Sequence, residues 1–579
     1  MPLSSLPAFE FDFLGALSHQ VTVRLQHRPR RSCLRFSLPA WTPGSYLIRD
    51  YVSQLEGLEV TQQERILPVR RTGTSAWQLD LPSLEPVEIR YRILAKDLTV
   101  RTCHCDADHG FLALAAVALE LEGERWSPHR LRLCLPEGWQ PFVPLPADPD
   151  GGWTARDFDQ LVDTPIEVGP HAAHSFGVAG VPHRWVSWGR TLGGADPVAE
   201  DPGWLADVEQ VCLACCRLMG VERPAADHYL FVLHLNDNGY GGLEHDASTV
   251  LQYGRRRLAQ PDGRRKLLQL VAHEYLHQWN VRRLRPAELI PYDYSRPVVI
   301  PTLWFAEGVT SYVDQLLPHA AGCCSEEEVL RDLASDLSRY LLTPGRRVQS
   351  LRQSGEEAWV KLYRADAHAP NNQISYYLKG AVLSLVLDLH LRRHGSALPV
   401  VLRDLWRRLG AAGRGYHEED LVAAFAAQAP DLQLLLPAWL RGLEDPPLAS
   451  ALGFVGLKLE PATAPLQWVG WQLQAAPQGL TLQRLVRDAP AQSAGLTVGD
   501  ELLALDGWRL RQPEDLTALL PPDRPPVART VLYSRDGQVR TTRLLPEPPA
   551  VDHWSLVCDP EASEAAAERR RRWLTLELP

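Results

Sequence analysis

Residues 271–280 read VAHEYLHQWN, and this stretch decides which fold and chemistry the 579-residue chain can have. His273 and His277 are four residues apart, so a helix would place both imidazoles on one face, about 6 Å apart along its axis. Two histidines with this spacing can share one tetrahedral Zn²⁺, and Glu274 would stand beside them to act on a water molecule. The neighbouring side chains are mostly apolar or aromatic, which predicts a buried helix. We therefore expect one Zn²⁺ per chain.

Glu307 is the candidate for a third metal ligand. Catalytic zinc usually has three protein ligands and one open position. Glu307 is the single acid in the apolar segment 303–312, LWFAEGVTSY. A carboxylate in such a segment is costly to bury unless it meets a metal ion or an opposite charge. We expect Glu307 to bind the metal; the alternative is an ion pair with Arg282 or Arg283.

The His-Glu-x-x-His helix followed by a Trp-x-x-Glu-Gly helix resembles the gluzincin metallopeptidases. Within that group, residues 273–286 (HEYLHQWNVRRLRP) together with 303–312 look like the glycyl aminopeptidase family. The resemblance implies a thermolysin-like α+β catalytic domain with a helical lobe that encloses a cleft. Four prolines lie between His277 and Glu307, so we expect a loop there.

The segment 241–245, Gly-Gly-Leu-Glu-His, resembles the Gly-x-Met-Glu-Asn strand with which related aminopeptidases hold the free α-amine of the substrate. It follows an apolar run and a polar turn, so we expect it on a strand edge beside the cleft. The resemblance implies that Gly241, Gly242 and Glu244 bind substrate. The alternative is an ordinary glycine-rich hairpin with a solvated glutamate.

Residues 376–380, Tyr-Tyr-Leu-Lys-Gly, resemble the Tyr-x-Lys-Gly segment whose tyrosine donates a hydrogen bond to the tetrahedral intermediate. Tyr377 fits that register, and Tyr376 is the second choice. A phenol suits the role because it donates a hydrogen bond without competing for zinc. The alternative is that both rings only pack.

Four regions are expected along the chain. Residues 1–175 alternate with period two, which predicts an antiparallel β domain with a sandwich arrangement. Residues 176–450 would form the peptidase domain, 451–545 a separate unit, and 546–579 a tail with a late helix. The turn at 41–46, WTPGSY, looks like one in the N-terminal domain of the same family, although such a turn could be purely structural.

The region 451–545 closely resembles a bacterial-type PDZ domain in the segments 489–496 (APAQSAGL) and 498–507 (VGDELLALDG). A short helix that ends at a glycine, followed by an alternating strand and an Asp-Gly turn, agrees with this. PDZ domains bind peptides by adding a strand to a sheet edge, so we expect a peptide or protein ligand. The loop that would bind the ligand's carboxylate lies near either Gly470 or Gly479.

Composition and local sequence patterns argue against several other functions. The formal charge of −10, from 60 basic and 70 acidic residues, disfavours a nucleic-acid binder. Glu10 and Asp12 interrupt any signal-peptide pattern, and no apolar run approaches membrane-spanning length. The ten cysteines are expected to be free thiols in a reducing cytoplasm. Cys103-His104-Cys105 and Cys212-x-x-Cys215 lack matching partner pairs, which disfavours a second metal site.

We therefore predict a zinc aminopeptidase that removes small N-terminal residues, with glycine and alanine implied by the family alone. Glu274 would be the general base and Tyr377 the oxyanion donor. The metal ligands would be His273, His277 and Glu307. One alternative is a zinc endopeptidase in which Glu244 contacts the peptide backbone. Another is a PDZ-centred binding protein with a non-catalytic peptidase scaffold, which the presence of Glu274 disfavours.

Overall fold

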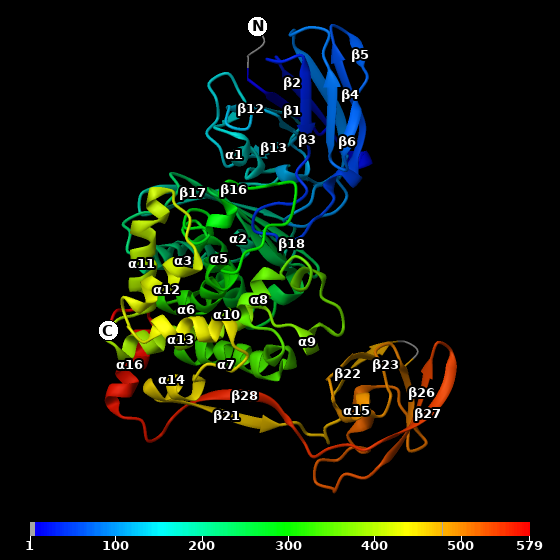
Figure 1. The fold of residues 1–579 in the computed structure, drawn as a ribbon, viewed down its shortest axis with the longest axis vertical. Helices are drawn as coiled ribbons and strands as arrows, with labels where there is room; N and C mark the ends of the chain where they lie inside the picture. Colours follow the sequence, from blue (N-terminus) through cyan, green and yellow to red (C-terminus); the bar gives the residue numbers. More distant parts are fainter. Residues whose placement is uncertain (1–5, 477–478) are drawn as a thin grey trace. The chain divides into compact units, whose positions relative to one another are not determined.

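The structure is a computed structural model that describes residues 6–476 and 479–579. The chain divides into two compact units, which Figure 1 allows the reader to follow by residue number. Unit 1 comprises Met1–Val298, Ala320–Cys323 and Leu402–His417. Unit 2 comprises Val299–His319, Cys324–Val401 and Glu418–Pro579.

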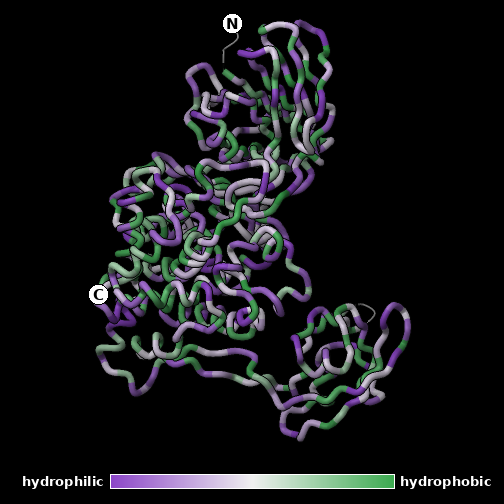
Figure 2. The backbone as a smooth tube through the Cα atoms, viewed as in Figure 1, coloured by the Kyte–Doolittle hydropathy of each residue, from purple (hydrophilic) through white to green (hydrophobic). Residues whose placement is uncertain are grey.

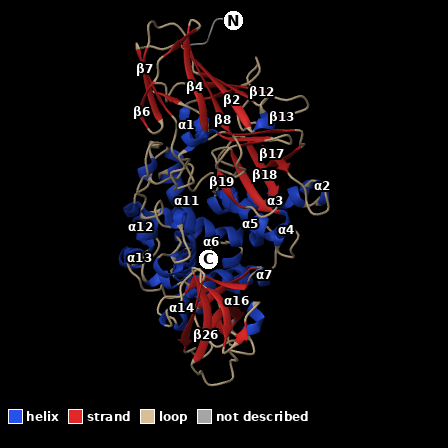
Figure 3. Cartoon of the chain, turned by 90° about the vertical axis from the view of Figure 1, so that its right-hand side faces the viewer, coloured by secondary structure: helices blue, strands red, loops and turns tan. Residues whose placement is uncertain are grey.

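The N-terminal part of unit 1 is built from β-strands, drawn red in Figure 3. Its largest sheet has seven strands, in the spatial order β14 (Trp153–Ala155), β12 (His129–Cys134), β1 (Ala8–Asp12), β2 (Gln20–His27), β8 (Val87–Leu94), β4 (Leu55–Gln62) and β5 (Arg65–Leu67). Strand β8 alternates as predicted, with buried Val87, Ile89, Tyr91 and Ile93. The prediction of a β-rich N-terminal region is confirmed.

One strand pair in this sheet departs from the predicted antiparallel arrangement. Strands β1 and β12 pair in parallel. The two strands are far apart in the sequence, and such a long connection allows parallel pairing, which a local alternation pattern cannot reveal.

Two four-stranded sheets complete this part of unit 1. The first has the order β11 (Glu120–Leu121), β3 (Cys33–Ser37), β7 (Ala76–Asp80) and β6 (Arg70–Gly73). The second has the order β13 (Gln140–Phe142), β15 (Pro165–Gly169), β10 (Gly110–Ala113) and β9 (His104–Cys105).

A five-stranded mixed sheet carries the candidate substrate strand. Its order is β16 (Ala173–Val178), β17 (Val181–Trp188), β18 (Tyr229–Asn236), β20 (Ser248–Gly254) and β19 (Tyr240–Glu244). Strands β17, β18 and β20 are parallel, and β19 is antiparallel at the edge. Strand β18 is buried along almost its whole length, as expected for a strand covered on both faces. Helix α5 (Gly263–Leu276) packs against β19 and β20, and α3 (Trp204–Met219) packs against α5.

Unit 2 contains the helical part of the molecule. Its main helices are the π-helix η5 (Trp304–Val309), α6 (Thr310–Ala320), α7 (Glu326–Leu342), α8 (Leu351–Glu356), α9 (Ala369–Asn372), α10 (Tyr376–Arg393), α12 (Glu418–Ala426), α13 (Leu432–Arg441) and α14 (Leu448–Phe454). The predicted capping box of Ser325 and Glu328 opens α7. Helix α10 is buried on nearly all sides, which confirms the core position expected for its apolar sequence.

The C-terminal part of unit 2 has a small sheet with its own hydrophobic core. Its order is β22 (Trp471–Ala476), β23 (Gly479–Leu485), β24 (Glu501–Leu505), β26 (Arg529–Arg535) and β27 (Gln538–Leu544), with β25 (Trp508–Arg509) paired to β24. Asp506 and Gly507 both have positive φ, so they form the predicted Asp-Gly turn. Core residues include Leu480, Leu482, Leu502, Leu505, Val531 and Leu544.

Two strands and a helix tie this sheet to the rest of unit 2. Strand β21 (Leu457–Thr463) precedes the small sheet in the sequence and β28 (Val551–Cys558) follows it, and these two strands pair with each other. Helix α16 (Glu564–Leu574) follows, and its Trp573 donates a hydrogen bond of 2.6 Å to the Tyr312 hydroxyl. The C-terminal helix α16 therefore packs against the helical part of unit 2 through Trp573.

Apolar and polar stretches alternate over short distances along the chain, as the hydropathy colours of Figure 2 show. Among the helices of the described residues, none combines the length and apolar character needed to span a membrane.

Candidate active site

The His-Glu-x-x-His sequence lies at the carboxyl end of helix α5. The regular helix ends at Leu276, and His277 is its C-cap residue, with φ −60° and ψ −15°. Because these angles are still helical, His273 and His277 remain on one face, and their ring centroids are 4.7 Å apart. The helix therefore ends one residue earlier than the motif suggests, without separating the two imidazoles.

A backbone hydrogen bond determines which nitrogen of His277 is available. Its Nδ1 lies 2.5 Å from the carbonyl oxygen of Asn280, so Nδ1–H donates and Nε2 keeps the lone pair. The side chain is only 1% exposed. A buried imidazole whose second nitrogen is anchored to a carbonyl is the usual state of a metal-ligating histidine.

The edge strand β19 lies directly against Glu274. A Cβ atom at Gly242 would stand 2.2 Å from Oε1 of Glu274, so only glycine allows this approach. Arg101 donates a hydrogen bond of 3.1 Å to the carbonyl of Gly242, in the middle of the strand. Ligand-type atoms of Glu244, Glu274 and His277 lie within 4.8 Å of one another. Unit 1 thus brings together the predicted base, one predicted metal ligand and the predicted substrate carboxylate.

Glu244 is a buried carboxylate at the end of β19. It is 4% exposed, and its Oε1 has no hydrogen-bond partner within the described residues. Both carboxylate oxygens would lie 2.6 Å from a Cβ atom at Gly44, whose φ is +83°. The turn 41–46 therefore packs on Glu244, and Gly44 is required there for space and for conformation.

The arginines that follow the metal motif have carboxylate partners of their own. Arg282 is 3% exposed and forms salt bridges of 2.8 Å to Asp163 and 3.0 Å to Asp246. Arg283 donates to the backbone carbonyl of Asp246. These pairs weaken the alternative in which one of the two arginines neutralises Glu307.

In unit 2, Glu307 lies on the π-helix η5 and is 2% exposed. The sequence predicted a helix here but not its π form. Such π-helices are rare in proteins, and those that occur are often found at functional sites. The next residue, Gly308, meets Gly380 of α10: a Cβ at Gly308 would lie 2.5 Å from the Gly380 Cα. The glycines of the Glu-Gly and Lys-Gly motifs therefore let the backbones of η5 and α10 touch.

Tyr377, near the start of α10, is the better placed of the two tyrosines. Burial raises its pKa well above the ordinary value, and the Glu307 carboxylate raises it further. Its hydroxyl lies 3.4 Å from that of Tyr363, and its ring stacks on Tyr376 at 4.7 Å. Tyr376 is fully buried, whereas Tyr377 is partly exposed. Tyr377 therefore stays protonated and lies within electrostatic reach of Glu307.

Three residues in these surroundings were not among the predicted site residues. Gly44 and Arg101 lie in turns of the N-terminal region and contact β19 across a large sequence separation. Tyr363 lies on the short 3₁₀ helix η7 (Leu362–Arg364), which precedes the Tyr377 motif. Only the resemblance of the 41–46 turn to the family's N-terminal domain could have drawn attention to Gly44.

Two family models and a crystal structure are similar to this chain over long stretches. The family model of the M61 glycyl aminopeptidase matches residues 266–383, and the model of the peptidase M61 N-terminal domain matches residues 9–170. The crystal structure of an aminopeptidase N family protein from Idiomarina loihiensis is 28% identical, covers 98% of this chain and 100% of its own, and superimposes with a TM-score of 0.92. The chain is a peptidase. Two separate stretches of the chain are thus similar to the peptidase M61 family.

More distant structures are also similar in part. Aminopeptidase A from Legionella pneumophila, in complex with aspartic acid, is 11% identical and has a TM-score of 0.46 over 97% of this chain and 58% of that chain. Yeast LTA4 hydrolase in complex with bestatin is 15% identical, with a TM-score of 0.45 over 77% and 68%. Likeness this weak carries no conclusion about fold or activity. No curated protein matches the sequence significantly.

Proposed function

We propose that the chain is a zinc-dependent aminopeptidase that hydrolyses the first peptide bond of its substrates. The observation that carries this proposal is the cluster of Glu244, Glu274 and His277, in which Glu244 is a buried carboxylate with an unpaired oxygen. A carboxylate in that state is stabilised by a cation, and the α-ammonium group of a peptide is a suitable one.

The proposed metal ligands are His273, His277 and Glu307. Two imidazoles and one carboxylate form a donor set typical of catalytic zinc. The hydrogen bond from Nδ1–H of His277 to Asn280 leaves the lone pair of the ring on Nε2, and Glu307 is buried on a π-helix. The residues present therefore fit zinc. A zinc ion there supplies Lewis acidity toward carbonyl and water oxygens.

The protein's own groups would carry the proton transfers. Glu274 accepts a proton from the attacking water as the new C–O bond forms, and it passes that proton to the amine nitrogen as the C–N bond breaks. Tyr377 donates a hydrogen bond to the developing oxyanion, and its raised pKa keeps the phenol protonated for this task. Glu244 holds the free α-amine, which fixes the length of the fragment removed.

Preference for glycine and alanine in the first position is the specificity that we propose from the family. A panel of aminoacyl coumarin amides, each with a free and an N-acetylated amine, tests the activity together with metal analysis of protein purified without chelators. We expect one tightly bound zinc for catalysis and turnover of the free-amine substrates alone. Efficient hydrolysis of the acetylated series would instead identify an endopeptidase.

The C-terminal sheet is proposed to bind peptide in the manner of a PDZ domain. Strand β22 is at one edge of the sheet and pairs only with β23 within the described residues. An edge strand of a sheet with its own core can accept an added peptide strand.

All ten cysteines are free thiols, which supports the expectation of a reducing compartment such as the cytoplasm.

A further inference from the structure

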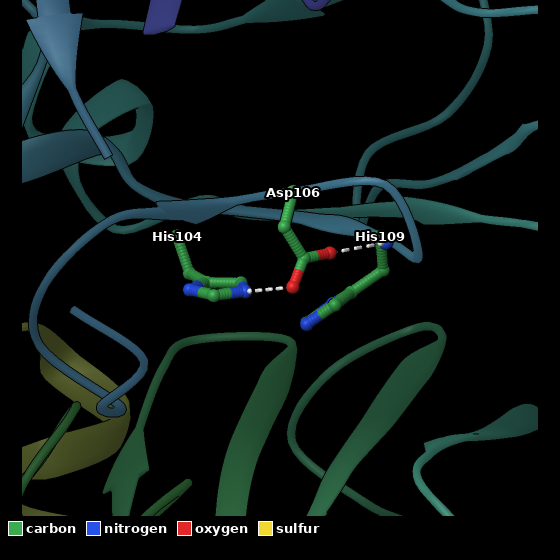
Figure 4. A group of neighbouring side chains, drawn as sticks. All are labelled: His104, Asp106 and His109. Carbon is green, nitrogen blue, oxygen red and sulfur yellow. Dashed lines mark hydrogen bonds and ion pairs between the residues drawn. The ribbon is translucent and has the colours of Figure 1, made fainter. Parts of the chain in front are cut away.

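A second group of metal-ligating side chains lies in the hairpin formed by β9 and β10. His104, Asp106 and His109 each offer one ligand atom, and the three atoms lie within 4.8 Å of one another. Figure 4 shows the two imidazoles on either side of the Asp106 carboxylate. The Nε2 atom of His104 is 3.1 Å from Oδ2 of Asp106. None of these residues belongs to the candidate active site.

The turn of the hairpin fixes the Asp106 carboxylate. Its Oδ1 accepts hydrogen bonds from the backbone N–H groups of Asp108, at 2.8 Å, and His109, at 3.2 Å. Oδ2 is thereby directed away from the turn and toward His104. This carboxylate is held in place by backbone geometry before any ion binds.

His109 has a ring nitrogen that lacks a partner. The side chain is fully buried, and Nδ1 lies 2.9 Å from Oε1 of Glu167. Nε2 is buried and has no hydrogen-bond partner among the residues that the structure describes. Trp188 stacks on the ring at 4.1 Å, so the ring has little freedom to turn. An unsatisfied buried nitrogen is costly, and a metal ion would supply the missing partner.

The contact between His109 and Glu167 suits ligation. With Nδ1–H donating to Glu167, the lone pair of the His109 ring stands on Nε2. A histidine that donates its second N–H to a carboxylate is the arrangement found behind metal-ligating imidazoles.

We propose that Nε2 of His104, Oδ2 of Asp106 and Nε2 of His109 bind a divalent transition-metal ion such as zinc, with Glu167 orienting His109. Ligand atoms of a tetrahedral zinc site are about 3.3 Å apart, close to the His104–Asp106 distance. The His104 and Asp106 side chains are 13% and 30% exposed, so an ion and a water ligand can enter.

The neighbouring cysteines do not belong to this site. Cys103 and Cys105 are buried, and neither belongs to the group of ligand atoms that lie within 4.8 Å of one another. The Cys-His-Cys motif of the sequence therefore contributes only its histidine, and the other two ligands come from the following turn.

The test uses the full chain with His273→Ala and His277→Ala, so that the proposed catalytic zinc does not contribute. Chelator-stripped protein is titrated with Zn²⁺ by calorimetry, and thermal unfolding is followed with and without the ion. We expect one bound zinc per chain and a melting temperature that zinc raises. In this background Asp106→Asn should weaken zinc binding at least about tenfold. The amide keeps the turn's hydrogen-bond acceptor but loses the charged ligand.

Asp108→Asn is the matched control, because Asp108 is an exposed acid in the same turn with no ligand role. The zinc affinity of the Asp108→Asn variant should equal that of the parent, which is the chain with His273→Ala and His277→Ala. Without metal, the parent and its Asp106→Asn and Asp108→Asn variants should have the same melting temperature. A His109→Gln variant should lose the same zinc equivalent. As a check that does not depend on the double variant, Asp106→Asn in the otherwise native chain should lose one metal equivalent while keeping peptidase activity. Absence of zinc binding in the folded parent, or unchanged affinity in Asp106→Asn, would overturn the proposal.

Discussion

At the scale of single residues, the role of Glu274 as the proposed general base can be tested most sharply. Glycine at position 242 brings strand β19 onto this carboxylate, so the base is held rigidly beside the substrate strand. Glu274→Gln keeps the shape of the side chain but cannot accept a proton. We expect kcat to fall by about 10²–10⁴ while KM and zinc content stay the same. Steady-state kinetics with metal analysis checks this, and a variant with most of its activity would exclude Glu274 as the base.

Tyr377 provides a second test at this scale. Tyr377→Phe removes a hydrogen bond that forms only in the transition state, so kcat should fall by about 10²–10³ with little change in KM. Tyr376→Phe is the matched control, because that ring stacks on Tyr377 but is fully buried. If the two variants exchange these effects, the oxyanion donor is Tyr376.

At the scale of elements, helix α10 contains a buried lysine with a consequence for pH. Nζ of Lys379 donates to the Arg346 carbonyl at 3.1 Å, and burial lowers its pKa to about 8. Because this value is below the 10.5 of an unperturbed lysine, the unfolded chain holds more protons between pH 8 and 10.5. The contribution of Lys379 to stability therefore improves as pH rises through that window.

Lys379→Met removes this titration. Relative to the variant, the native chain should gain about 2 kcal/mol of stability between pH 7 and pH 9.5. Melting temperatures of the two proteins at both pH values measure the change, and comparing the difference between proteins cancels the other titrating groups. A difference that stays constant with pH would show that Lys379 titrates normally.

Local sequence signals predicted those elements whose cause is local. The Ser325–Glu328 capping box, the apolar sequence of α10 and the Asp506–Gly507 turn all have their expected structures. The π form of the helix that contains Glu307 was not predicted, and neither was the contact of its Gly308 with Gly380, because these two glycines are distant in sequence and a local pattern cannot reveal their approach. The support of Glu244 by the 41–46 turn was missed for the same reason.

At the scale of the whole molecule, the small C-terminal sheet is inserted between two paired strands. Ala464 N–H donates to the Ala550 carbonyl at 2.9 Å, where β21 and β28 meet, so the ends of the insertion are adjacent. Replacing residues 465–549 by a short Gly/Ser linker should leave cleavage of dipeptides nearly unchanged and reduce cleavage of longer peptides. Equal losses for both substrate lengths would indicate a structural role.

Deletion of the entire segment 453–579 is expected to behave differently. It removes Trp573, which is fully buried and donates to Tyr312 in the helical part. Loss of such an aromatic anchor should destabilise unit 2 itself. The sequence indicated a late helix in the tail. It could not show this packing, because Trp573 and Tyr312 are far apart in the sequence.

The central claim is that Glu244 binds the free α-amine of the substrate. Its most direct test is kcat/KM for glycyl and N-acetylglycyl coumarin amides, measured with the native chain and with Glu244→Gln. We predict that the native enzyme cleaves only the free-amine substrate and that Glu244→Gln lowers this kcat/KM about 30-fold or more, as for a broken buried charge pair. Efficient cleavage of the acetylated substrate, or indifference to Glu244→Gln, would contradict the account.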